Sequence, residues 1–122
     1  MGFVSEALQL MKMNNYSEAA KLMESHLSDL DLKPSAKVSI MSWISECYAK
    51  SDDRQSAGRW SEQAGRTALA CQSIPKFEKM QKAREEFEIA MGHYEAVNDV
   101  KGMGRMASLK YGMTTNPNTS SS

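Results

Sequence analysis

The chain has 122 residues, of which 41% are hydrophobic and 25% are charged, so it is long enough for one folded domain of ordinary composition. Fifteen Lys and Arg residues balance fifteen Asp and Glu residues. This balance, without a basic stripe, argues against a nucleic-acid-binding protein. Hydrophobic runs are only a few residues long, so we expect no insertion into a membrane.

Helical spacing of hydrophobic residues continues along the whole chain, and no stretch alternates as a β-strand would. The first predicted helix covers about residues 2–13. Asn15 is the expected cap of the second helix, about 16–30, because Glu18 three residues later would complete a capping box. Pro34 cannot continue that helix, so a third helix is predicted over about residues 35–50.

Three more helices are predicted after the acidic turn at residues 51–53. The fourth, about 53–71, has Asp52 or Asp53 as its cap. Pro75 suits the first turn of the fifth helix, about 75–97, and a sixth covers about 100–112. We predict a helical domain over residues 1–112 and, because residues 113–122 are small and polar, a disordered tail.

Connections of two to five residues join these six helices, and short connections place consecutive helices antiparallel. The sequence therefore predicts an all-α fold of three stacked helical hairpins. A small residue where helices cross closely, in units of 34 to about 40 residues, is typical of an α-solenoid.

The spacing of bulky and small residues resembles the tetratricopeptide repeat family. In that family the first helix carries a bulky, a small and a bulky residue, and the second an Ala, a bulky and a small residue. In the first unit these positions are Phe3, Ala7, Leu10, Ala19, Met23 and His26. In the second they are Met41, Ser45, Tyr48, Ala57, Ser61 and Ala64. In the third they are Phe87, Met91, Tyr94, Met103, Ala107 and Lys110.

His26 and Ser61 depart from the family pattern, and the first two units are 38 residues apart. The chain is in this respect similar to the longer-helix relatives of the SNAP type. The resemblance implies a right-handed α-solenoid whose first helices line a concave groove for a partner helix or extended segment. A generic helical bundle is the alternative fold.

Positions that match groove-lining sites of the family are expected to bind the partner. The expected partner-binding residues are Val4, Leu8, Met11, Lys12, Glu46, Lys50 and Glu88; Ser39, Ser42, Ala49, Glu85 and Glu95 occupy further groove positions. The Lys and Asn residues with which some members clamp a chain-terminal carboxylate are absent from the matching positions. An apolar first unit followed by carboxylates favours a partner with apolar and basic residues. Alternatively, Val4, Leu8 and Met11 pack on a neighbouring helix.

The fifth helix has a seam of apolar residues that recur at heptad-like spacing. The seam comprises Phe77, Met80, Phe87, Met91 and Tyr94. Either the neighbouring helices of the same domain cover it, or it joins copies of the chain in a homodimer or larger assembly. Burial of Val4, Leu8 and Met11 with exposure of this seam would favour a structural subunit; the reverse would favour an adaptor.

Residues for catalysis are sparse. His26 and His93 lie in different predicted helices, and no Cys or His residues have the spacing of a metal site. Gly102 and Gly104 lack the Lys-Ser/Thr of a phosphate-binding loop and are expected to allow close helix packing. Cys47 and Cys71 are interpreted as reduced thiols of a cytoplasmic protein. We therefore expect a non-enzymatic adaptor without a cofactor.

Overall fold

The computed structural model describes residues 2–29 and 31–120, with side chains described as far as Met113. It confirms the all-α prediction, because these residues form helices and no strand. The six helices are α1 (Gly2–Lys12), α2 (Tyr16–His26), α3 (Pro34–Lys50), α4 (Arg54–Ala70), α5 (Lys76–Ala96) and α6 (Val100–Ser120).

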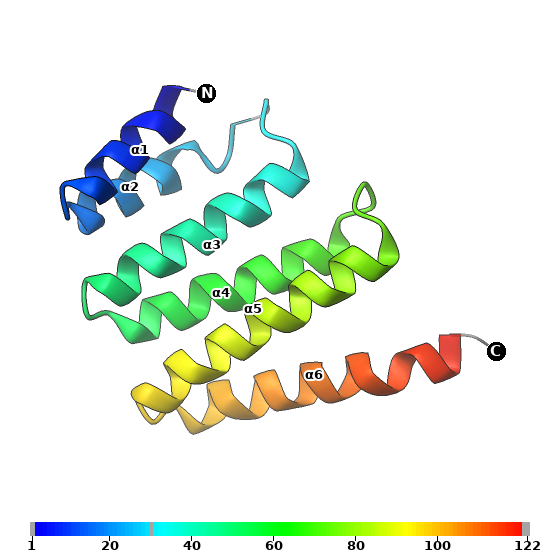
Figure 1. Ribbon diagram of the computed structural model, residues 1–122. Coiled ribbons are helices and arrows are strands. Elements are labelled where there is room, and N and C mark those ends of the chain that lie inside the picture. Colours follow the sequence, from blue (N-terminus) through cyan, green and yellow to red (C-terminus); the bar gives the residue numbers. More distant parts are fainter. Residues whose placement is uncertain (1, 30, 121–122) are drawn as a thin grey trace.

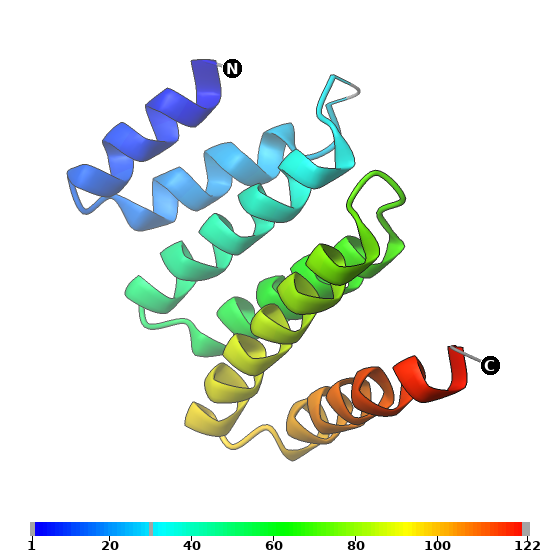
Figure 2. The same ribbon diagram turned by 45° about the vertical axis from the view of Figure 1, so that its right-hand side comes forward.

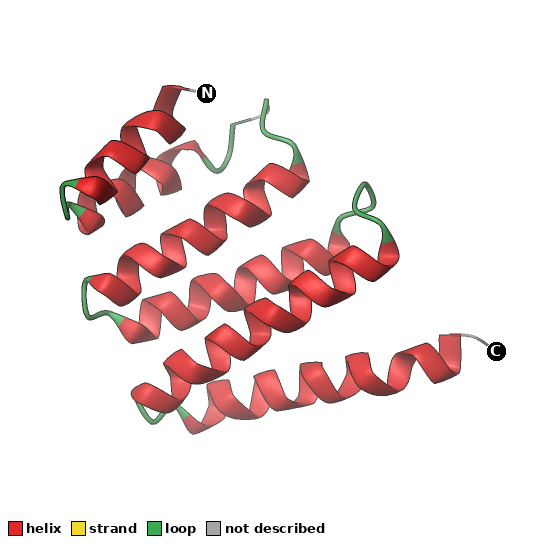
Figure 3. Cartoon of the chain, viewed as in Figure 1, coloured by secondary structure: helices red, strands yellow, loops and turns green. Residues whose placement is uncertain are grey.

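Each helix runs antiparallel to the one before it and packs mainly on its neighbours in the sequence (Figure 1). The most extensive contact joins α4 and α5. In the turned view, α1 and α2 lie at one end of the molecule and α6 lies at the other (Figure 2). The α1–α2, α3–α4 and α5–α6 turns share one edge, and the other two connections lie at the opposite edge (Figure 3).

The three turns on the shared edge have the same backbone geometry. Each contains one residue with positive φ: Asn14 (63°), Asp52 (64°) and Asn98 (58°). Asn and Asp tolerate this left-handed conformation better than most residues. In each turn, the N–H of the next residue donates to the carbonyl five positions earlier, at N···O distances of 2.8, 2.9 and 2.9 Å. The same local device therefore reverses the chain three times.

The helix caps and boundaries differ in part from the prediction. Asp53 caps α4, since its Oδ1 accepts the Ser56 N–H at 3.1 Å. Asn15 precedes α2 but makes no side-chain cap bond, so the predicted capping box is wrong. The second helix ends at His26, and Pro34 lies inside the first turn of α3, where its missing N–H costs no hydrogen bond.

Two main clusters form the core. The first joins α1, α2 and α3 around Met23, Ile40 and Ile44. The second joins α5 and α6 around Phe87, Tyr94 and Met106. Helix α4 lies between them and buries mostly small residues: Ala57, Gly58, Ser61, Ala64, Gly65 and Ala68. Small side chains on α4 leave room for the large aromatic rings of α5.

Residues 113–122, the predicted tail, lie mostly beyond the described side chains, so their disorder stays a prediction. The backbone of α6 is described as helix through Ser120. Met113, the first residue assigned to the tail, is buried and belongs to the cluster around Phe87 and Tyr94. The packed part of α6 therefore includes at least this residue. None of the described helices combines the length and hydrophobicity needed to cross a bilayer.

Candidate functional site

Helix α1 carries apolar residues on two adjacent sides. Phe3, Ala7 and Leu10 pack against the first core cluster. Val4 and Leu8 do not belong to that cluster, and Leu8 is 42% exposed. Met11 lies between the two sides, because it is partly buried and contacts the core. Val4 and Leu8 are thus apolar residues at the surface of the outermost helix.

The polar residues Lys12, Glu46 and Lys50, which the sequence analysis expected to bind the partner, lie on α1 and α3. Lys12 and Lys50 are exposed and end their helices on the shared turn edge. The Lys50 ammonium lies 6.0 Å from the centroid of the Tyr16 ring. Glu46, one turn before Lys50, is exposed and forms no ion pair with any described residue. Its carboxylate therefore remains available to a basic group.

Glu88 lies on α5, away from the residues of α1 and α3, and its role in partner binding stays a prediction. Its Oε1 lies 3.7 Å from Lys110 Nζ of α6, so the side chain faces α6. The carboxylate that α5 directs toward α3 is Glu86, which accepts a 2.9 Å hydrogen bond from Ser42 Oγ and pairs with Lys82 Nζ at 3.0 Å. Ser42 therefore holds α3 to α5.

Sequence reasoning missed Glu86, which is fully buried and leaves Oε1 without a partner among the described atoms. The sequence did contain a signal for the burial of Glu86. Ala83, Glu86 and Ala90 are all buried and follow helical spacing. A carboxylate within a stripe of small apolar residues can point inward, but the stripe alone does not name Ser42 as its partner.

The fifth-helix seam lies mainly inside the chain. Phe87 and Tyr94 are fully buried, so the idea that they join copies of the protein is wrong. Met80 and Met91 are partly buried and pack against the same cluster. Only Phe77, which is 79% exposed, remains at the surface. The seam is covered because the glycines of α4 and α6 admit the aromatic rings.

A polar network around Glu62 joins α4, α5 and α6. Tyr94 Oη donates to Glu62 Oε1 at 2.6 Å, and Arg105 donates to both carboxylate oxygens at 3.1 and 3.2 Å. Arg66 donates twice to Oε2 at 3.1 and 3.0 Å. Burial acts to raise the pKa of Glu62, but the hydrogen bonds from Arg105, Tyr94 and Arg66 outweigh it and lower the pKa. Glu62 is therefore an ionised carboxylate held by two guanidiniums.

The same contacts act on Tyr94. Burial and the hydrogen bond to Glu62 raise the pKa of Tyr94 to about 12. The phenol is therefore a neutral donor at physiological pH, and it crosslinks the helices without acting as a base. Nothing in the sequence pattern predicted this pairing, because Glu62 and Tyr94 are 32 residues apart.

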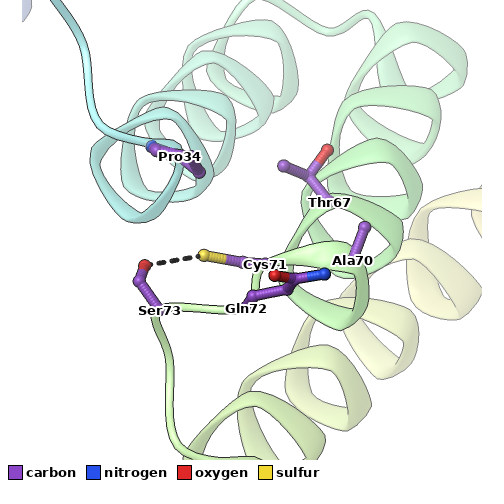
Figure 4. Close-up of a pocket in the computed structure, with 6 residues that line it drawn as sticks. All are labelled: Pro34, Thr67, Ala70, Cys71, Gln72 and Ser73. Carbon is purple, nitrogen blue, oxygen red and sulfur yellow. Dashed lines mark hydrogen bonds between the residues drawn. The ribbon is translucent and has the colours of Figure 1, made fainter.

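A pocket of about 450 Å³ (Figure 4) lies near the α2–α3 and α4–α5 connections, at the edge opposite the three like turns (Figure 3). It is lined by Pro34, Thr67, Ala70, Cys71, Gln72 and Ser73. Cys71 Sγ lies 3.1 Å from Ser73 Oγ, and this hydrogen bond lowers the pKa of the Cys71 thiol. None of the six lining residues is a His or a carboxylate that could act as a base for the thiol.

The two histidines do not meet. His26 Nδ1 lies 2.8 Å from Asp29 Oδ2, and its ring stacks on Phe3 with centroids 4.3 Å apart. This ring pair lines a second pocket of about 340 Å³ at the start of α1. His93 lies on α5, and its buried Nδ1 has no partner among the described atoms.

The described residues contain no group of three or more His, Cys, Asp or Glu side chains that could hold a metal ion. Comparison with protein-family models, with curated proteins and with solved structures finds no match to this chain.

Proposed function

We propose that this protein is a non-enzymatic adaptor that binds a helix or extended segment of a partner protein along its first helices, α1 and α3. One observation carries the proposal: Leu8 is 42% exposed beside the partly buried Val4 and Met11, whereas Phe87 and Tyr94 of the alternative seam are fully buried. Apolar side chains gathered at a surface are typical of protein-binding sites.

The proposal includes a tetratricopeptide-like architecture, a right-handed α-solenoid of three stacked hairpins with α1, α3 and α5 on its inner side. Three observations support it: consecutive helices are antiparallel, the three hairpin turns share one backbone geometry, and small residues lie where α4 meets α5. The free thiols Cys47 and Cys71 favour a cytoplasmic location.

Charge on the surface defines the partner further. The exposed Glu46 lacks an ion pair within the described chain, so a basic residue of the partner can bind it. Lys12 and Lys50 lie at the turn edge beyond Glu46 and would attract an acidic residue. A segment with an apolar anchor for Leu8 and charges in this order would bind in one orientation, because complementary charge fixes register more than affinity.

Leu8→Glu tests the proposal by capture of partners from a native extract. Gln9→Glu is the matched control, because Gln9 is also exposed on α1 and the change adds the same charge one position away. Circular dichroism checks that both variants stay folded. We expect a partner that wild type and Gln9→Glu retain and Leu8→Glu loses, through a mapped segment with apolar and basic residues. Equal retention by both variants would remove α1 from the binding site.

A structural subunit remains the second candidate function because of one residue. Phe77, at the start of α5, is 79% exposed, and a large aromatic side chain in water is unfavourable. A second copy of the chain could cover it. Light scattering over a concentration series would then give a dimer mass that Phe77→Ser abolishes, and a constant monomer mass would exclude this candidate.

A further inference from the structure

Net positive charge is concentrated on two of the six helices. Helix α4 carries Arg54, Arg59 and Arg66 with the single acid Glu62, and α6 carries Lys101, Arg105 and Lys110 with no acid. These two helices thus have six basic residues and one acidic residue, a net charge of +5, although the whole chain has a net charge of 0. The rest of the chain is therefore acidic.

Helices α4 and α6 run parallel on either side of α5 (Figure 1). Two side-chain contacts set their register: Gln55 Nε2 to Asp99 Oδ2 at 2.8 Å, and Arg105 Nη2 to Glu62 Oε1 at 3.1 Å. The partners are 44 residues apart in the first contact and 43 in the second. Each turn of α4 therefore lies beside the turn of α6 that is about 43 or 44 residues later in the chain.

The basic side chains follow the outer stripes of both helices. On α4 the exposed stripe contains Arg59, Gln63 and Arg66, and on α6 it contains Lys101, Arg105 and Ser108. These residues recur at intervals of three or four, so each stripe stays on one helix face. Arg66 and Arg105 meet at Glu62, which places the two stripes beside each other.

Glu62 orients the two guanidiniums without using all their donors. Arg66 and Arg105 each use Nε and Nη2 on the carboxylate. A guanidinium has five N–H donors, and both arginine side chains are 46% exposed, so their Nη1 groups remain for an external acceptor. Arg105 also lies over the Tyr94 ring, with Cζ 5.6 Å from the centroid. Both guanidinium groups are therefore held in a fixed orientation before any ligand binds.

We propose that this outer face of α4 and α6 binds an acidic, Asp- or Glu-rich segment of a partner protein. Arg66 and Arg105 would donate their free N–H groups to carboxylates, with Arg59 and Lys101 adding charge one to two turns away. The planar guanidinium fork matches a carboxylate, and prior orientation reduces the entropy lost on binding. This surface is separate from the Leu8 surface of α1 and does not depend on it.

A short acidic peptide fits the charge better than a nucleic acid. Nucleic-acid affinity grows with the number of phosphates neutralised along an extended basic surface. Here the basic residues end with two helices, and the net charge of the molecule is 0. Neutral residues, Gln63 on α4 and Ser108 on α6, also interrupt the two rows of basic residues.

Fluorescence anisotropy with a labelled ten-residue Glu-rich peptide tests the proposal on the full chain. The Arg59→Gln, Lys101→Gln variant removes two exposed charges without touching Glu62, so the fold and the Arg66–Arg105 pair should persist. Lys21→Gln, Lys33→Gln is the matched control, since it removes two exposed charges elsewhere. We expect the first variant to weaken binding about fivefold or more and the control to change it by less than about twofold.

Three results would overturn the proposal: no binding to the Glu-rich peptide, equal weakening by both double variants, or tighter binding to a single-stranded oligonucleotide of equal charge. The last result would identify the face as a nucleic-acid site. Arg66→Lys tests the guanidinium itself, because it keeps the charge beside Glu62 but removes the fork. Weaker peptide binding by this variant supports the assignment, and unchanged binding contradicts the role of the fork.

Discussion

At the scale of single residues, glycines decide how closely the helices approach. An added Cβ would lie 2.8 Å from the Tyr94 ring at Gly58, 2.5 Å from the Phe87 ring at Gly65, and 2.7 Å from the Tyr94 ring at Gly102. Both rings are fully buried, and a close-packed core leaves them little room to move. A single methyl group at these positions would therefore disturb the core.

Gly102→Ala is expected to lower the free energy of unfolding by about 1–3 kcal/mol, because the buried Tyr94 ring must shift. Gly104→Ala is the matched control on the same helix, since nothing lies within 4 Å of its added Cβ. That change should raise stability by about 0.5–1 kcal/mol through a higher helix propensity. Urea denaturation measures both, and equal shifts of the two midpoints would contradict the close approach at Gly102.

The two glycines also show what a sequence can predict. The sequence led us to expect close packing at both Gly102 and Gly104. Two positions apart on an α-helix they point about 200° away from each other, so one neighbour cannot contact both. The decisive ring belongs to another helix, and the local pattern does not reveal which glycine it meets.

The lowered pKa of His93 predicts that the stability of the protein changes with pH. Burial, with a smaller effect from the charge of Arg54, lowers the pKa of His93 below 6.5. The unfolded chain therefore takes up this proton at a higher pH than the folded chain. The contribution of His93 to the free energy of unfolding is therefore fully present above pH 6.5. It is lost as the pH falls from there through the pKa of the folded state.

Urea midpoints between pH 7.5 and 5 would measure this change, and His93→Gln should flatten the slope in that range. The carboxyl groups of Glu62 and Asp53 have pKa values below 4.5 and 3.8, so they titrate outside the window. A slope that His93→Gln leaves unchanged would assign the proton to another group.

At the scale of helices, the caps distinguish turns that look alike in sequence. Asn15 and Asp53 both follow a residue with positive φ and precede a helix. Only Asp53 accepts a cap hydrogen bond, from the Ser56 N–H. Asp53→Ala should therefore cost about 1 kcal/mol of stability, and Asn15→Ala clearly less. Thermal denaturation compares them, and equal losses would show that the Asn15 side chain also caps its helix.

The number and order of helices followed from the sequence because hydrophobic periodicity, Pro34, Pro75 and the Asn and Asp turns are local signals. The site followed only in part. The sequence left open whether Leu8 packs on a neighbouring helix, and the structure leaves it exposed; Glu88 lies close to Lys110 of α6. Glu62 and Glu86 appear as ordinary polar positions until helices distant in sequence supply Arg105 and Ser42. Such long-range pairs depend on packing, which the local pattern does not contain.

At the scale of the whole molecule, the two proposed surfaces differ in chemistry. The proposed α1–α3 surface would combine the apolar Leu8 with the exposed Glu46, and the α4–α6 face is strongly basic. An adaptor with both could hold two segments of opposite charge, or one partner that reaches around the molecule. The polar network around Glu62 links the second face to the core, so that face is rigid before binding.

The most direct test of the adaptor is hydrogen exchange of the complex with the partner that Leu8→Glu loses. Slower exchange of amides in α1 and α3, at residues 2–12 and 34–50, is the predicted result, because a bound segment restrains local opening of the helices it covers. Protection confined to the start of α5 around Phe77, with α1 unchanged, would contradict the account and favour assembly through that residue.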